Sequence, residues 1–153
     1  DDDIWYMSGS ANSSTNVDTI SNFEAGSGLD IMNLTSLSAF EATTTEAIGA
    51  LTTFNATGSD NDNILVLNTG HYHANAAALL SNMAAAGEST AGSSIATAAV
   101  NVAVAYQASS GGNVRIAQAT VANAGGFTAV TDLAILSGVT DVTSLHKTNF
   151  VLD

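Results

Sequence analysis

Two histidines separated by a single residue are the side chains of this sequence best suited to metal chemistry. His71 and His73 would share one face of a strand, so both imidazoles could reach one zinc or copper ion. His146 is a candidate third ligand, and Asp60 or Asp62 is a candidate carboxylate ligand. The pair also fits a loop that leads from a strand into a helix, so a metal-dependent hydrolase ranks third among our hypotheses.

Other catalytic patterns fail on their spacing. Neither Ser109 nor Ser110 has a glycine two positions before it, as a nucleophile elbow requires. The turn at 26–28 lacks the third glycine of a dinucleotide fingerprint, and a chain with no cysteine has no thiolate nucleophile. Glu41 and Glu46 lie five positions apart in a Thr/Ala-rich stretch, a spacing that does not establish an acid/base pair. We therefore expect a protein that is not an enzyme.

Charge excludes further classes of function. The 153 residues contain 14 acidic side chains but only two fixed cations, Arg115 and Lys147, which gives a formal net charge of -12. Without a basic patch, binding to nucleic acid or to anionic lipid is not expected. No apolar run approaches the roughly 18 residues of a membrane span, so membrane insertion is not expected either. Hard cations such as calcium are natural partners for so many carboxylates, although an acidic surface that only keeps the chain in solution fits the composition equally well.

A short segment resembles the calcium-binding repeat of parallel β-rolls. Ala25–Asn33 reads AGSGLDIMN and matches four of the five fixed positions of the nonapeptide G-G-x-G-x-D-x-U-x, with Ala25 in place of the first glycine. Residues 58–64 form a weaker echo, and residues 2–5 fit the end of a third. Because these echoes lie about thirty residues apart rather than nine, the chain contains no tandem array.

Two longer segments extend the resemblance to a family. Residues 17–31 are similar to the D-x-I-x-x-F … G-x-D-x-I sequence that follows the repeats of RTX proteins, which leave bacteria by type I secretion. Residues 136–152 resemble the L-x-G-V … L-T-x-x-N-F-V-L endings of such proteins. The resemblance implies recognition by the type I secretion machinery, an uncleaved C-terminal signal, and folding outside the cell. No cleavable N-terminal secretory signal is expected, since no basic stretch followed by an apolar one opens the sequence.

The resemblance also implies a calcium role. Calcium at the ~10⁻⁴–10⁻³ M affinity of extracellular modules would neutralise the acids and lock the turns once the chain is outside the cell. The carboxylates expected to bind it are Asp18, Asp30, Asp60 and Asp62, followed by Asp2 and Asp3.

The hydrophobic pattern predicts a mostly β, α+β fold in a single domain spanning residues 1–153. Short β-roll-like strands and turns are expected over residues 1–67. Residues 68–153 are expected to form a helix at 74–86, a β-hairpin at 98–121 and a C-terminal strand at 150–152, with residues 131–136 open between strand and helix.

Two finer expectations concern which side chains are buried. Ala77, Leu80 and Met83 share the helix face expected to pack against the core. In the hairpin, Val102 and Val104 alternate with small residues, which predicts a strand buried on one face only.

Our leading hypothesis is a non-catalytic, calcium-binding C-terminal module of a secreted extracellular or cell-surface bacterial protein. The alternative is a structural subunit of a surface layer or extracellular filament. Ala/Val/Thr-rich strands with few charged residues at their edges favour self-association at strand edges.

Overall fold

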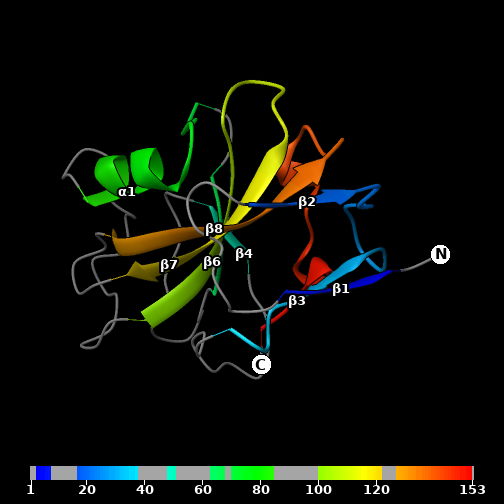
Figure 1. The fold of residues 1–153 in the computed structure, drawn as a ribbon. Coiled ribbons are helices and arrows are strands. Elements are labelled where there is room, and N and C mark those ends of the chain that lie inside the picture. The colour runs from blue at the N-terminus through cyan, green and yellow to red at the C-terminus, as the bar shows by residue number, and fades with distance from the viewer. Residues whose placement is uncertain are drawn as a thin grey trace.

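The computed structural model describes residues 3–7, 17–37, 48–50, 63–67, 70–84, 100–121 and 127–152. In this part of the chain, strands dominate and form two sheets accompanied by one α-helix (Figure 1). The expected mostly β, α+β fold class is therefore confirmed.

The elements follow one another in an order that mixes short and long strands. The strands are β1 (Ile4–Tyr6), β2 (Asp18–Ser21), β3 (Ile31–Asn33), β4 (Ile48–Ala50), β5 (Ile64–Val66), β6 (Val100–Gln107), β7 (Val114–Val121), β8 (Phe127–Ser137) and β9 (Phe150–Val151). The helix α1 (Ala76–Ala84) lies between β5 and β6, and two 3₁₀ turns, η1 (Val142–Ser144) and η2 (Lys147–Asn149), lead into β9. Residues 131–136, which the sequence left open, belong to a strand.

The larger sheet has six strands in the order β2-β8-β7-β6-β5-β4. The predicted hairpin is confirmed, because β6 and β7 pair antiparallel from Val100–Val121 to Gln107–Val114. β8 continues the antiparallel meander, whereas β2, β4 and β5 join the sheet in parallel pairs.

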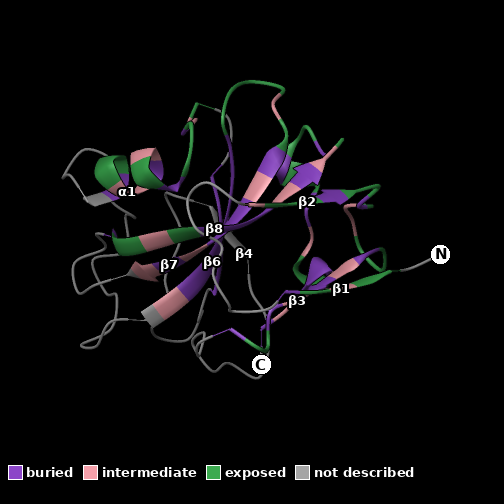
Figure 2. Ribbon diagram, in the orientation of Figure 1, coloured by how far each residue is buried: buried purple, intermediate pink, exposed green. Residues whose placement is uncertain are grey.

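The central strands of this sheet are buried on both faces, which corrects the one-faced burial predicted for the hairpin. Ala103 and Ala105 of β6 pack toward the smaller sheet, while Val102, Val104 and Tyr106 pack toward α1. Figure 2 shows the buried residues concentrated where the strands cross the middle of the molecule. Strand alternation therefore separates two layers of core instead of a core face and a solvent face.

Helix α1 covers one face of the six-stranded sheet. Asn75 precedes it, and the Asn75 Oδ1 accepts the Ala78 N–H at 3.0 Å, which is an N-cap interaction. The buried face holds Ala76, Leu79 and Met83, while Ala77 is exposed and Leu80 half-buried. The predicted face is thus displaced by about one residue, because the contact with the sheet rather than the apolar pattern sets the rotation of the helix.

The smaller sheet has three parallel strands in the order β1-β3-β9. Its inner row, Trp5–Met32–Phe150, faces the core that it shares with the six-stranded sheet. Short strands, which the sequence predicts over residues 1–67, occur in the described part of that range, but they are divided between the two sheets instead of forming one roll. β1 pairs with β3 and β3 with β9, whereas β2 pairs with β8 and β4 with β5 in the six-stranded sheet. No helix in the described part of the chain is long and apolar enough to cross a membrane.

Candidate functional site

The two sequence segments that carry the resemblance meet in space, although about 120 residues separate them. The turn between Glu24 and Asp30 lies against the C-terminal residues 146–152. β9 pairs with β3 directly after this turn, with Met32 opposite Phe150 and Asn33 opposite Val151.

Asn149 joins the two segments. Its Oδ1 accepts N–H groups from Gly26 at 3.0 Å and from His146 at 2.8 Å. Its Nδ2 donates to the carbonyls of Gly26 at 3.0 Å and Asp30 at 2.7 Å. An amide side chain offers two donors and two acceptor positions, so this fully buried residue uses its entire capacity.

Gly26 has a conformation that suits this contact and few other residues. Its φ of 140° lies in the region that side chains rarely adopt, and a Cβ would lie 3.1 Å from the Leu29 Cδ1. The glycine thus lets the backbone present both its N–H and its carbonyl to Asn149.

Asp30 fixes the start of the same turn. Its Oδ1 accepts the Asp3 N–H and its Oδ2 the Glu24 N–H, each at 3.0 Å, and the residue is only 2% exposed. Burial favours the neutral acid, but the N–H groups of Asp3 and Glu24, the positive charge of the N-terminus and the Trp5 side chain together lower the pKa of this carboxyl below its ordinary value. The side chain is therefore an anion held by protein N–H groups.

A strap of residues 139–152 connects the turn to the six-stranded sheet. The Val114 N–H donates to the Val139 carbonyl at 2.8 Å, and the Gln107 Nε2 donates to the Thr140 carbonyl at 2.7 Å. Phe150 and Leu152 are buried in the core between the sheets. We call residues 139–152, together with the turn 24–30, the C-terminal clasp.

The expected calcium ligands that the structure describes, Asp3, Asp18 and Asp30, are not gathered at one place. Asp3 and Asp30 are neighbours, but Asp18 lies on β2 in the other sheet and is exposed. No group of three or more acidic or histidine side chains is close enough to hold a metal in the part of the chain that the structure describes. The remaining candidates, Asp2, Asp60 and Asp62, lie outside the described residues, as does most of the 58–64 echo.

His71 and His73 lie in the segment that leads into α1, whereas His146 lies before η2. His73 is buried beneath α1, where its Nδ1 bonds the Asn82 Nδ2 at 3.0 Å and its ring meets Tyr106 edge-on at 6.2 Å. His146 caps η2, where its Nδ1 accepts the Thr148 N–H. Among the described residues, His146 therefore does not lie close enough to His71 and His73 to complete a metal site with them.

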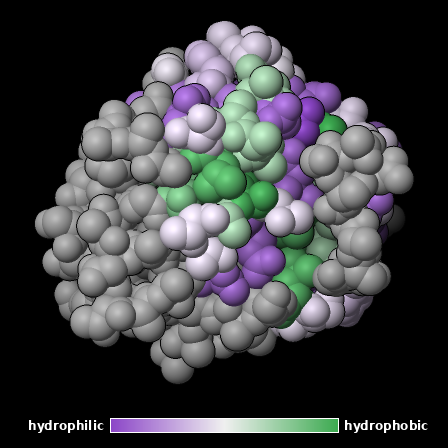
Figure 3. Space-filling view, turned by 60° about the vertical axis from the view of Figure 1, so that its left-hand side comes forward, coloured by the Kyte–Doolittle hydropathy of each residue, from purple (hydrophilic) through white to green (hydrophobic). Residues whose placement is uncertain are grey.

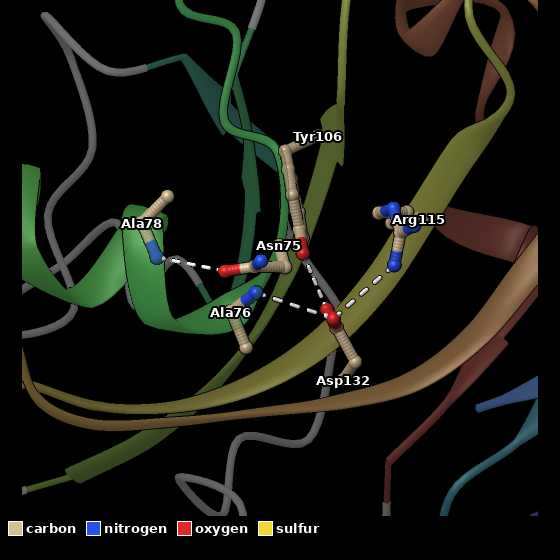
Figure 4. A network of polar contacts seen from close by, with 6 residues as sticks. All are labelled: Asn75, Ala76, Ala78, Tyr106, Arg115 and Asp132. Atoms are coloured by element: carbon tan, nitrogen blue, oxygen red, sulfur yellow. Dashed lines mark hydrogen bonds and ion pairs between the residues drawn. The ribbon is translucent and has the colours of Figure 1, made fainter. Parts of the chain in front are cut away.

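A second buried polar group lies at the start of α1 (Figure 4). The Asp132 Oδ2 accepts the Ala76 N–H at 3.2 Å and an Arg115 guanidinium N–H at 3.3 Å. The Tyr106 hydroxyl donates to the Asp132 Oδ1. This carboxylate binds the first turn of the helix, where the helix dipole favours negative charge.

A β-bulge directs Asp132 toward the helix. Asp132 pairs with Ala117 and Ala134 pairs with Ile116, so Leu133 is an extra residue in β8. Without it, residues 132 and 134 would share a face; with it, Ala134 faces the core between the sheets and Asp132 faces α1.

This second group joins α1 to the six-stranded sheet. Burial, then the bond to Asp132 and the charge of that carboxylate, raise the pKa of Tyr106 above its ordinary value, so Tyr106 remains a donor. Both oxygens of Asp132 accept hydrogen bonds from protein donors.

Sequence reasoning missed the two polar residues that organise the molecule. Asn149 lies inside the C-terminal motif, but the motif does not predict that its side chain bonds to the backbone of Gly26 and Asp30. Asp132 is the one acid within the 11-residue strand β8, and an acid in an apolar strand was the available signal.

Comparison with known proteins gives no match. No family model matches the chain, and no curated protein or solved structure is significantly similar to it.

Proposed function

We propose that this chain is a non-catalytic C-terminal module of a type I-secreted extracellular or cell-surface protein, and that it closes through the C-terminal clasp after export. One observation carries the proposal. The two segments that resemble RTX proteins, residues 17–31 and 136–152, contact each other through Asn149, Gly26 and Asp30.

The clasp gives the proposed signal two states. In the folded chain, Asn149, Phe150 and Leu152 are buried, and β9 is paired with β3. An exporter can contact these residues only while the chain is unfolded, because folding buries them. The pairing of β3 with β9 spans most of the chain, and such non-local contacts form slowly. Slow closure favours export before folding.

Calcium has a limited place in this proposal. Asp30 already has two N–H partners and needs no cation, so calcium would act at other carboxylates, with Asp3 and Asp18 the exposed candidates in the described residues. Its effect would be to offset the net charge of -12.

Export of a fusion protein tests the proposal. A slow-folding reporter is joined to the N-terminus of the 153-residue chain and expressed in a bacterium that carries a type I exporter. We expect the reporter in the medium, and we expect deletion of residues 139–153 to retain it in the cell. Reporter alone, and reporter–chain in cells without the exporter, are the controls.

A point variant separates the signal from the fold. Asn149→Ala breaks the clasp but leaves the rest of the ending intact, so the fusion should still be exported while the exported chain should be protease-sensitive. Equal retention of the full-length fusion and the deletion would contradict the proposal.

A further inference from the structure

The large apolar side chains that are exposed in the described residues gather at one sheet. Ile4 is 51% exposed, Tyr6 74% and Leu29 36%. The first two are on β1, and Leu29 is in the turn that leads into β3 (Figure 2). On the side of the molecule turned forward in Figure 3, apolar and hydrophilic residues lie next to each other in the part of the surface that is not grey.

The outer face of this sheet is apolar along a row of neighbours. Ile4 and Tyr6 pair with Ile31 and Asn33, and Asn33 pairs with Val151, so these five side chains share one face. Ile31 and Val151 are half-buried. Parallel sheets are normally covered on both faces, yet among the described residues this sheet packs against a core on its inner face only.

β1 is also an edge strand of this sheet, so one side of its backbone has no partner strand among the described residues. In the described part of the chain, β1 pairs with β3 and with no other strand. The Ile31 N–H donates to the Asp3 carbonyl and the Met7 N–H to the Asn33 carbonyl. The backbone N–H and carbonyl groups of residues 3, 5 and 7 therefore point toward β3. Those of Ile4 and Tyr6 point away from β3, to the unpaired edge of the strand.

The acidic residues near β1 indicate whether a second copy of this chain or a basic protein would bind there. Asp3 and Glu24 are exposed at the N-terminal end of this edge, where their N–H groups converge on the carboxylate of Asp30. A second copy of the chain would bring the same acids and another net charge of -12. A basic partner would be attracted instead.

We infer that β1 accepts an extended segment of another protein as an added strand. Apolar side chains at alternate positions of that segment would cover Ile4 and Tyr6, and a Lys or Arg side chain would lie near Asp3 and Glu24. This is strand addition to a sheet edge, in which backbone bonds supply affinity and alternate side chains supply selectivity. The inference goes beyond the proposed function and holds whether or not the chain is exported.

Selection from a random peptide library displayed on phage tests this surface. The library is panned on the immobilised chain after depletion on the Tyr6→Thr variant. Selected peptides are then synthesised with a fluorescent label and measured by anisotropy. We expect alternating apolar residues with at least one cation, and about 100-fold weaker binding to the double variant Ile4→Thr, Tyr6→Thr.

A proline variant isolates the backbone contribution. Ile4→Pro removes an N–H that points to the open edge, a position where edge strands tolerate proline, so the fold should persist by circular dichroism. Binding should be weaker than for Ile4→Thr, which keeps the N–H. Thr19→Ala on β2, an edge of the other sheet, is the matched control and should bind as the parent chain does.

Three results would overturn the inference. The first is a library that yields no peptide whose binding depends on Ile4 or Tyr6. The second is a set of selected peptides that are acidic. The third is self-association of the chain through Tyr6 in sedimentation equilibrium, which would make a second copy the occupant.

Discussion

At the scale of single residues, Asn149 is the side chain on which the C-terminal clasp depends. Its replacement by alanine leaves two N–H groups and two carbonyls without their partner in a buried place. Since each buried unsatisfied group costs about 1–3 kcal/mol and part of this is recovered by water, we expect Asn149→Ala to lower the free energy of unfolding by about 3–4 kcal/mol. Urea denaturation followed by circular dichroism measures this loss.

Asn113→Ala is the matched control for that variant. Asn113 is exposed, and its Oδ1 accepts one N–H, from Gly138 at 3.1 Å. Its loss should cost about 1 kcal/mol or less. Equal losses for the two variants would contradict the role assigned to Asn149.

Asp30 gives a second prediction, which concerns pH. Its pKa is lowered in the folded chain, so its ionised form stabilises the fold above the unfolded-state pKa of about 4, and this contribution is lost as the pH falls through the lower folded value. Asp30→Ala should therefore cost about 2–4 kcal/mol at pH 7, and less as the pH falls through the folded-state pKa of Asp30, where the parent chain loses the same contribution.

The same variant tests whether Asp30 is a calcium ligand. If N–H groups are its partners, the loss at pH 7 should be equal with chelator and with millimolar calcium. A loss seen only with calcium would show that Asp30 binds the metal, and would return it to the ligand set that the sequence predicts.

At the scale of elements, the attachment of α1 depends on one carboxylate in the neighbouring sheet. Asp132→Ala removes the partner of the Ala76 N–H, of the Tyr106 hydroxyl and of the half-buried Arg115. We expect a loss of about 3–5 kcal/mol, in the range found when one member of a buried ion pair is removed. Amide hydrogen exchange should rise first in α1, because the N-terminal end of this helix loses its bond to Asp132.

Asn75→Ala separates anchoring from ordinary capping. Asn75 is exposed and caps the helix through one bond to the Ala78 N–H, so its loss should cost about 1 kcal/mol. Exchange that rises equally in both variants would argue against Asp132 as the main anchor.

Local patterns predicted the elements well but not their arrangement. The strands near 4–7, 17–23 and 30–34, the helix and the hairpin follow from apolar runs, turn residues and helix propensity, which act over a few residues. Pairing of β3 with β9, and of β2 with β8, joins segments more than 100 residues apart, and no local signal encodes it. The bulge at Leu133 has the same cause, since an extra residue exists only relative to the partner strand.

The candidate site shows the same limit. Gly26, Gly28 and Asp30 were found because they form a local motif, but the motif suggested a metal where the fold supplies N–H groups from Asp3 and Glu24. A carboxylate in a glycine-rich turn looks the same in both cases when its surroundings are unknown.

At the scale of the whole molecule, the net charge of -12 sets the response to ions. Any salt should stabilise the fold by screening repulsion among the acids, so only an effect beyond screening indicates bound calcium. We expect about 10 mM calcium to raise the free energy of unfolding by about 1–3 kcal/mol over sodium chloride of equal ionic strength, as one or two sites of roughly millimolar affinity would. Magnesium at the same concentration is the control, since it releases its water reluctantly and should do less. If calcium, magnesium and sodium act alike at equal ionic strength, calcium is not a partner, and the acids act through charge alone.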